Sequence, residues 1–391
     1  MRLPQPVSQP ESAATALPPL CVDLDGTLVK SDTLIDSLLV LVRTRPLRAL
    51  ALPLRVFEGR AAFKARVTSA VSLDVEHLPY NRKVLQFLEE EHGRGRTILL
   101  ATGADERLAR RIADHLGLFS GVLGSDGTTN LTGSRKLDGL RAELNSSPFD
   151  YIGNGRADLP LLESAAGCMV ANPSRGLRAG LRARGLQPAR EFEERAHLLE
   201  SIVRAARPRR WAKNLLLFLP MLLAHMLAAG RIAAALLAFG AFSMAASAAY
   251  IVNDLLDLEA DRRDRRKRQR PFAAGDLSPA AGLAMAALFL LLSLLGARLL
   301  PPEFLAWLGF YLVLTLAYSA ALKRIGVVDA LSVSALCVLR LPAGAAATQI
   351  QISRGMAGFS VVLFFSLAIA LRFAKHQSQR GAGREPGDSR G

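Results

Sequence analysis

Apolar residues are distributed unevenly along the chain, and their pattern changes at about residue 210. Before that point, short apolar runs alternate with amphipathic stretches, which is typical of strands and helices in an α/β domain with a parallel sheet. After it, the apolar runs are long enough to cross a bilayer. Six such spans carry few or no charges: 215–229, 232–252, 277–297, 304–322, 325–347 and 356–371. The pattern predicts an α/β domain followed by an all-α, multi-spanning membrane domain.

Charged residues are also distributed unevenly. The chain has 49 Lys and Arg against 34 Asp and Glu, and residues 201–391 hold 23 of the former and only 10 of the latter. The basic residues cluster before the first span and after the second, fourth and sixth, so they fall on one side of the membrane. By the positive-inside rule this is the cytoplasmic side. We therefore predict a multi-pass protein of the cell inner membrane with a cytoplasmic α/β domain, and no nucleic-acid partner.

The ends of the chain and its cysteines add two further expectations. The three Cys and six His show no spacing typical of a disulfide framework or a zinc site. Both ends are polar, and the first residues lack the apolar core of a signal peptide, so disorder is expected there. The predicted parts are an arm at 1–18, an α/β domain at 19–203, a membrane domain at 204–375 and a tail at 376–391.

A short buried-strand pattern at Leu20–Leu24 runs into the sequence DLDGT. Residues two apart in an extended segment point the same way, so Asp23 and Asp25 are expected to share one site. Such a pair suits phosphoryl transfer through an aspartyl-phosphate, in which Asp23 attacks and Asp25 donates a proton to the leaving oxygen. A divalent cation would offset the negative charge. The alternative is a strand followed by an acidic turn of no catalytic importance.

DLDGT after a strand resembles the first motif of the haloacid dehalogenase superfamily of phosphohydrolases. The family's later motifs follow in order, and the resemblance covers about residues 18–200. It implies a parallel α/β sheet flanked by helices. It also assigns phosphate contacts to Thr102, in the strand-like segment TILLATGA, and to Lys136, in GSRKLDGL.

The fourth motif of that family resembles FDYIGNGRADLP in this chain. The resemblance makes Asp158 a ligand of Mg²⁺ together with Asp23 and Asp25. Asn154 stands where the family usually has an aspartate. Because an amide brings no negative charge to the metal, we expect weaker Mg²⁺ binding and low activity.

Between the first two motifs lies an apolar and basic stretch, LIDSLLVLVRTRPLRALALPLRVF. Arginines and a proline interrupt it, so it contains no uncharged span of 18 residues. We expect a helical cap over the hydrolase site or a hairpin on the membrane surface, and no crossing.

The second apolar span ends in four polar residues, and seven Lys or Arg follow between Arg262 and Arg270. The four are Asn253, Asp254, Asp257 and Asp261. On one continuous helix the three carboxylates would lie within roughly 60° of one another. Carboxylates that share a face at a membrane boundary repel, which Mg²⁺ bridging to a diphosphate would relieve. The alternative is a solvated loop in which acids and bases pair.

The predicted topology brings Lys213, Tyr318 and Lys323 to the same membrane surface. Arg340 falls about 16 Å deeper, at 1.5 Å per helical residue. A buried arginine needs an anion or a carboxylate partner. The partner is either a phosphate of the substrate or Asp329, eleven residues earlier in the chain.

NDLLDLEAD matches in full the NDxxDxxxD motif of the UbiA superfamily of intramembrane prenyltransferases, which the chain resembles over about residues 205–375. RPRRWAKN, KRQRPFAAG and VLRLPAG resemble its decaprenyl-phosphate phosphoribosyltransferase branch. The resemblance implies transfer of 5-phosphoribose from phosphoribosyl pyrophosphate to a polyprenyl phosphate, with Mg²⁺ held by the four residues of the motif. It assigns phosphate contacts to Lys213, Lys267, Arg270, Tyr318, Lys323 and Arg340.

The implied partners are a polyprenyl phosphate or diphosphate, phosphoribosyl pyrophosphate and membrane lipids, with a second copy of the chain as a further candidate. A tethered phosphatase would meet the lipid product at roughly millimolar effective concentration. We therefore predict that lipid-linked ribose 5-phosphate is the substrate of the hydrolase domain.

Two other functions stay open. The membrane domain could prenylate an aromatic acceptor with a polyprenyl diphosphate, which would require a pocket for a neutral ring. It could also be a non-catalytic anchor for the phosphatase, because the superfamily has more spans than the six predicted here. In that case we expect little transfer, while phosphatase activity persists.

Overall fold

The computed structural model describes residues 17–50, 59–320 and 326–351, and four single positions between 355 and 366. This part of the chain forms two compact units. The first comprises residues up to His197 with the segments Leu258–Gln269 and Ala273–Ser278. The second comprises Leu198–Asp257, Arg270–Phe272 and residues from Pro279 onward. Most of the predicted arm and all of the predicted tail lie outside the described residues.

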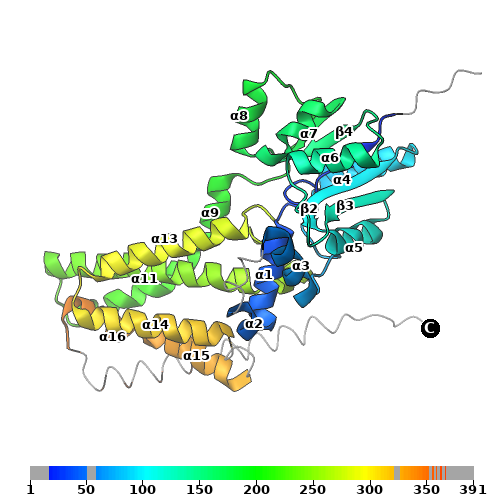
Figure 1. Ribbon diagram of the computed structural model, residues 1–391. Helices are drawn as coiled ribbons and strands as arrows, with labels where there is room; N and C mark the ends of the chain where they lie inside the picture. The colour runs from blue at the N-terminus through cyan, green and yellow to red at the C-terminus, as the bar shows by residue number, and fades with distance from the viewer. Residues whose placement is uncertain are drawn as a thin grey trace, which may run out of the picture. The chain divides into compact units, whose positions relative to one another are not determined.

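The first unit is built on a six-stranded parallel sheet with the strand order β3-β2-β1-β4-β5-β6 (Figure 1). Its strands are β1 (Leu20–Val22), β2 (Ile98–Asp105), β3 (Gly121–Ser125), β4 (Asp150–Gly153), β5 (Gly167–Ala171) and β6 (Arg190–Phe192). The predicted α/β fold is thereby confirmed. The strand order reverses between β1 and β4, and in open α/β sheets ligands bind beyond the carboxyl ends of the strands at such a point.

Helices cover both faces of this sheet, so its strands are apolar on both sides. Leu20 and Val22 of β1 pack into one apolar cluster, while Cys21 between them packs into another. The helices are α1 (Thr33–Thr44), α2 (Pro46–Leu50), α3 (Arg60–Ala70), α4 (Arg82–Gly93), α5 (Glu106–Leu116), α6 (Ser134–Glu143), α7 (Leu159–Ser164) and α8 (Arg175–Ala183), with the 3₁₀ turn η2 (Arg156–Asp158).

Helices α1 and α2 lie in the stretch predicted to be a cap, and α3 follows it; polar side chains define where α1 begins. Asp32 is its N-cap, and its carboxylate accepts hydrogen bonds from the N–H groups of Leu34 and Ile35. The described part of this stretch contains no helix of 18 residues. Residues 51–57 of the stretch lie outside the described residues, so the expectation that it does not cross the membrane stays a prediction.

Two segments of the first unit, Leu258–Gln269 and Ala273–Ser278, come after Asp257 in sequence and are called the connector segments. They contain α12 (Leu258–Arg263) and the 3₁₀ turn η4 (Lys267–Gln269). Although these residues lie between two membrane helices in sequence, they pack with the sheet unit.

The second unit is all-helical. Its helices are α9 (Leu198–Ala206), the 3₁₀ segment η3 (Pro208–Phe218), α10 (Leu219–Leu223), α11 (Ala229–Leu256), α13 (Pro279–Ala297), α14 (Pro302–Ala320), α15 (Gly326–Val338) and α16 (Arg340–Thr348). Helices α11 and α13 run side by side (Figure 1), joined by a hydrogen bond from the Ser293 hydroxyl to the carbonyl of Ala241. Phe242 packs against Phe304 and Tyr311 at the centre of the bundle.

Three helices of this unit are long and apolar enough to cross a membrane: Ala229–Leu256, Pro279–Ala297 and Pro302–Ser319. They correspond to the second, third and fourth predicted spans. The prediction of a crossing at 215–229 is wrong, because this stretch folds as η3 and α10 and then turns at His225, whose φ is 54°. The 3₁₀ geometry and Pro220 prevent one continuous α-helix.

The fifth predicted span, 325–347, forms two consecutive helices, α15 and α16, which are separated at Leu339. Pro342 accounts for the interruption. In a regular helix its ring would clash with the carbonyl of Val338, and it has no N–H group to donate to that carbonyl. The sixth span lies almost wholly outside the described residues. The count of six crossings is therefore not confirmed.

Candidate functional site

The first candidate site lies at the carboxyl ends of β1 and β4. Lys136 at the start of α6 donates to Asp23 Oδ1 at 2.8 Å and to Asp158 Oδ1 at 3.1 Å. Tyr151 donates its hydroxyl proton to the same Asp158 oxygen at 2.9 Å. All four side chains are buried. The structure thus brings together Asp23, Lys136 and Asp158, which were predicted from separate motifs, and Lys136 bonds to both carboxylates.

Asp158 holds the site together through both of its oxygens. While Oδ1 accepts from Lys136 and Tyr151, Oδ2 accepts from the backbone N–H groups of Asn154 and Gly155 at 3.1 and 2.9 Å. Burial alone would raise the pKa of Asp158, but Lys136 and these hydrogen bonds hold it below its usual value. Asp158 is therefore an anion that positions Lys136 and the loop after β4.

Asp25 is oriented by the beginning of α1. The backbone N–H of Thr33 donates to Asp25 Oδ1 at 2.8 Å. A small cavity of about 70 Å³ lies next to it, with Asp32, Lys64 and Asp105 among its lining residues. Lys64 comes from cap helix α3 and reaches the carbonyl of Gly103 at 2.6 Å. The cavity is small enough to suit a phosphate group and little more.

Electrostatics in this site favour an added cation. Burial raises the pKa of Asp23 to about 6, an effect that Lys136 partly opposes. Burial, and next the charge of Asp32, raises the pKa of Asp25 to about 7. Both shifts arise first because burial disfavours the charged form of a carboxyl group, and then because neighbouring carboxylates add negative charge. Oxygen donors with excess negative charge are what a hard divalent cation such as Mg²⁺ binds.

Thr102 lies within β2 and is fully buried. Its hydroxyl oxygen accepts a hydrogen bond from the N–H of Ala104 at 3.0 Å. This leaves the hydroxyl proton for an acceptor such as a phosphate oxygen, and the role predicted for Thr102 stays a prediction.

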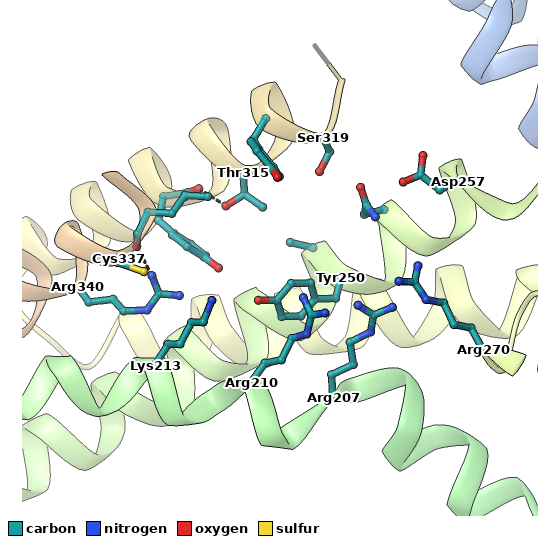
Figure 2. Close-up of a pocket in the computed structure, with 15 residues that line it drawn as sticks. Arg207, Arg210, Lys213, Tyr250, Asp257, Arg270, Thr315, Ser319, Cys337 and Arg340 are labelled. Carbon is teal, nitrogen blue, oxygen red and sulfur yellow. Dashed lines mark hydrogen bonds between the residues drawn. The ribbon is translucent and has the colours of Figure 1, made fainter. Parts of the chain in front are cut away.

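The second candidate site is a cavity of about 280 Å³ within the helical unit. Five cationic side chains line it: Arg207, Arg210, Lys213, Arg270 and Arg340. Figure 2 shows Arg207, Arg210 and Lys213 extending from one segment toward Tyr250, with Arg340 at one end of the row and Arg270 at the other. Asn253, Asp257, Tyr318 and Thr315 also line the cavity. A cavity with five cations and one carboxylate is suited to a ligand with several negative charges.

Aromatic rings support these cations. The guanidinium carbon atoms of Arg207 and Arg210 lie 5.5 and 4.9 Å from the ring centroid of Tyr250. Arg340 lies against the rings of Phe242 and Tyr311, at 5.4 and 5.2 Å. Such contacts stabilise a cation by about 0.5–2 kcal/mol without neutralising it.

Arg340 is buried and has uncharged hydrogen-bond partners. Its Nε donates to Asn214 Oδ1 at 2.8 Å, and its Nη1 donates to the carbonyl of Leu336. Asn214 is itself fixed by a hydrogen bond to Ser243 Oγ at 2.9 Å. The alternative partner considered from the sequence was Asp329, whose side chain lies outside those the structure describes.

Asp254 is buried and bound by two of the arginines that line the cavity. Both of its oxygens accept from Arg207, at 2.7 and 2.5 Å, and Oδ1 also accepts from Arg270 at 3.1 Å. In this arrangement Asp254 positions two lining arginines, while Asn253 and Asp257 line the cavity themselves. These two side chains fit a role as ligands of Mg²⁺; Asp254 would have to release its arginines first.

The expectation that three carboxylates share one regular helical face is wrong. Helix α11 ends at Leu256, Asp257 is its C-cap, and α12 begins at Leu258. Asp261 and Lys267 belong to the other compact unit, where Lys267 Nζ lies 3.9 Å from Asp261 Oδ1. Lys323 lies outside the described residues.

Sequence reasoning missed several residues that line the cavity: Arg207, Arg210, Tyr250, Tyr311, Thr315, Ser319 and Cys337. The two arginines were counted as topological charges. A signal was available, since they stand three residues apart in RPRRWAKN and Lys213 follows three residues later. That spacing brings all three to one face of a helix or 3₁₀ segment.

Two family profiles match this chain. The UbiA prenyltransferase family matches residues 217–385, and the haloacid dehalogenase-like hydrolase family matches residues 20–163. The protein y4nM of Sinorhizobium fredii is 35% identical over 385 residues, covering 95% of this chain and 73% of that protein. The C-terminal part of the chain is a UbiA prenyltransferase family domain. Its N-terminal part is a haloacid dehalogenase-like hydrolase domain.

The chain is also similar to the decaprenyl-phosphate phosphoribosyltransferase of Mycobacterium tuberculosis, with 39% identity over 168 residues. The match covers 41% of this chain and 54% of that enzyme, so the chain spans about half the length of that relative. A UbiA homolog from Archaeoglobus fulgidus, solved with DMAPP and Mg²⁺, is 19% identical with a TM-score of 0.39, covering 47% of this chain and 66% of that one. Family membership and the three apolar helices identify an integral membrane protein.

Proposed function

We propose that the membrane domain transfers 5-phosphoribose from phosphoribosyl pyrophosphate to a polyprenyl phosphate. The observation that carries this proposal is the cavity lined by five cations. Both substrates are anionic, whereas a neutral aromatic acceptor would have little use for so many cations. The similarity to decaprenyl-phosphate phosphoribosyltransferases points to the same reaction.

In the proposed reaction an oxygen of the lipid phosphate attacks C1 of the ribose. The bond from C1 to the diphosphate oxygen breaks, and diphosphate leaves with the electron pair. The acceptor needs no general base because its phosphate is already ionised. Mg²⁺ bound by Asn253 and Asp257 would neutralise charge on the diphosphate. Arg207, Arg210 and Arg270 would donate charge-assisted hydrogen bonds to the same group.

The lipid phosphate is assigned to the other end of the cavity. Arg340 lies there among apolar and aromatic residues of the membrane helices, and Lys213 lies beside it (Figure 2). Tyr318 offers a hydroxyl group to the same cavity. This assignment accounts for the cost of burying Arg340, because an anionic ligand offsets that cost. Lys267, Lys323 and Asp261 stay candidates for additional phosphate and metal contacts.

The test is incubation of membranes containing the chain with labelled phosphoribosyl pyrophosphate and polyprenyl phosphate. Label should appear in the lipid fraction only when Mg²⁺ and both substrates are present. Product that forms instead from a polyprenyl diphosphate and an aromatic acid would refute the proposal and favour aromatic prenylation. Absence of either product in a chain with active phosphatase would favour an anchoring role.

We also propose that the hydrolase domain is a phosphatase on the cytoplasmic side of the inner membrane. Asp23 would attack the phosphorus, and the ester oxygen would leave with a proton from Asp25, whose pKa of about 7 leaves it partly protonated at neutral pH. Water would then attack the phosphorus and give its proton to Asp25, which breaks the bond to Asp23 and releases inorganic phosphate. Lys136 and Thr102 would bind the phosphate oxygens. Mg²⁺ at Asp23 and Asp25 would offset the charge of acids and phosphate.

The proposed phosphatase substrate is the lipid-linked ribose 5-phosphate made by the attached transferase. The two domains are one chain, so the product forms at high local concentration. The Asp23→Asn variant should accumulate the phosphorylated lipid, whereas the wild-type chain should release inorganic phosphate from it. Equal accumulation in both proteins would exclude this substrate.

A further inference from the structure

Arg262, the residue after Asp261 in the NDLLDLEAD motif, makes a buried ion pair within the sheet unit. Its Nη1 donates to Asp36 Oδ2 at 2.9 Å, and only 4% of the Arg262 side chain and 1% of the Asp36 side chain are exposed. Its Nη2 donates to the hydroxyl oxygen of Ser31 at 3.2 Å. The Ser31 hydroxyl in turn donates to Asp36 Oδ2 at 2.6 Å. One guanidinium therefore connects both ends of the turn from Ser31 to Asp36.

This turn carries the N–H group that donates a hydrogen bond to Asp25, the proposed general acid. Thr33, in the middle of the turn, donates its N–H to Asp25 Oδ1 at 2.8 Å. The carbonyl of Ser31 accepts from the N–H of Gly26 in the DLDGT loop at 3.3 Å. A shift of the turn would therefore move both the donor to Asp25 and the loop after Asp23.

The ion pair between Arg262 and Asp36 is not expected to contribute much to the free energy of unfolding. Arg262 Nε and Asp36 Oδ1 are buried without a hydrogen-bond partner among the described residues. Buried ion pairs with unsatisfied atoms often contribute less stability than apolar residues of similar volume. What this pair provides is a fixed geometry for the Ser31–Asp36 turn.

A second contact from the connector reaches the start of the same turn. Gly275 packs so closely on Lys30 that a Cβ there would lie 2.6 Å from Lys30 Cβ. Gly275 also has a φ of 76°, which an L-residue rarely adopts. Both connector segments therefore contact the chain between Lys30 and Asp36.

We propose that Arg262 is a positioning residue for the phosphatase site, supplied by the sequence that connects the transferase helices α11 and α13. It holds the Ser31–Asp36 turn so that the Thr33 N–H stays on Asp25. The inference rests on the proposed phosphatase activity, and it makes proton donation to the leaving group depend on residues of the transferase sequence. Lys136 and Thr102, which are proposed to bind the phosphate, lie outside this turn, so KM is expected to change less than kcat.

The test compares full-length variants in detergent with p-nitrophenyl phosphate as the ester. Arg262→Met keeps the side-chain length and removes the charge, and Arg262→Lys keeps the charge. Arg263→Met is the matched control, because Arg263 is the next residue and binds Asp74 at the surface, at 2.6 Å with 56% of its side chain exposed. Amide hydrogen exchange at Thr33 is measured in the same samples, and exchange in β1 and β2 reports whether the unit is folded.

Arg262→Met should lower kcat about tenfold while KM stays within about twofold, since misplacing a catalytic group by about 1 Å costs up to ~100-fold. Exchange at Thr33 should become faster, Arg262→Lys should recover part of kcat, and Arg263→Met should behave as wild type. If Arg262→Met does not fold, the comparison of Arg262→Lys with Arg263→Met decides.

The inference is overturned by an unchanged kcat in Arg262→Met, by an equal loss in Arg263→Met, or by unchanged exchange at Thr33. If the wild-type chain hydrolyses no ester, the proposed phosphatase activity fails separately. Exchange at Thr33 then still decides whether Arg262 holds the turn.

Discussion

The side-chain amide of Asn154 lies directly on Gly26 of the DLDGT loop. A Cβ at Gly26 would lie 1.9 Å from Asn154 Nδ2, so no other residue fits there without displacing Asn154. Gly26 also has a φ of 78°, which favours glycine. The loop after β4 therefore brings residue 154 against the loop after β1, where a carboxylate would add its charge to those of Asp23 and Asp25.

The first prediction concerns Asn154→Asp. The added negative charge should tighten Mg²⁺ activation of ester hydrolysis about tenfold, equivalent to about 1.4 kcal/mol. The measurement is the Mg²⁺ concentration for half-maximal hydrolysis. Asn145→Asp is the matched control, because Asn145 is an exposed asparagine in another loop of the same unit. An unchanged Mg²⁺ dependence in Asn154→Asp would show that residue 154 contributes nothing to the metal site.

The sequence was sufficient to predict that Asp23, Lys136 and Asp158 lie together in the hydrolase domain, because Asp23 and Asp158 follow β1 and β4. Asp23, Lys136 and Asp158 belong to local motifs, and parallel strands bring their carboxyl ends to one edge whatever the details of packing. The hydrogen bond from Thr33 to Asp25 and the contact with Arg262 could not be predicted. They depend on how α1 and the connector pack, and the sequence pattern contains no information on this.

The cavity of the membrane unit was only partly predictable, for a different reason. A cluster of arginines beside an apolar span looks the same whether it faces lipid headgroups or a cavity, so Arg207 and Arg210 were read as topology. Tyr250 and Tyr311 lie in apolar helices, where periodicity does not distinguish a lining ring from a core ring. No proline or glycine marks the end of α11 at Asp257 in the sequence. Asp261 therefore lies in α12, whereas Asp254 lies in α11.

The second prediction separates Asp257 from Asp254. Asp257→Asn should abolish Mg²⁺-dependent transfer and leave the melting temperature unchanged, because Asp257 lines the cavity and fills no core volume. Asp254→Ala should abolish transfer and also destabilise the membrane unit, by about 3 kcal/mol, since Arg207 and Arg270 lose their shared buried partner. Equal melting temperatures of the two variants would contradict this distinction.

The third prediction concerns Arg340. Arg340→Met should reduce transfer about 10- to 100-fold, the value of a charge-assisted hydrogen bond to phosphate. The loss should appear mainly as a raised KM for polyprenyl phosphate, with little change in the KM for phosphoribosyl pyrophosphate. Arg298→Met is the control, because Arg298 is exposed after α13. A raised KM for phosphoribosyl pyrophosphate alone would reverse the assignment of the two ends of the cavity.

The fourth prediction is a pH dependence of stability in the sheet unit. Folding raises the pKa of Asp23 to about 6 and that of Asp25 to about 7, from about 3.8. Between pH 4 and 7 the folded state therefore binds more protons than the unfolded state, so the free energy of unfolding decreases as pH rises. The lowered pKa of Asp158 changes the free energy of unfolding only below about pH 4, outside this window.

In EDTA, the protection of β1 amides against hydrogen exchange should therefore decrease from pH 4 to pH 7. Millimolar Mg²⁺ should restore this protection more at pH 7.5 than at pH 5, because the cation binds the ionised carboxylates. Asp25→Asn is the comparison, since it keeps the shape of the side chain and removes one of the two titrating groups. The decrease should become smaller in this variant, and most of what remains should lie below pH 6, where Asp23 titrates. If Asp25→Asn follows the wild-type profile over the whole range, the titration arises elsewhere, and the excess of buried carboxylates is not what binds the metal.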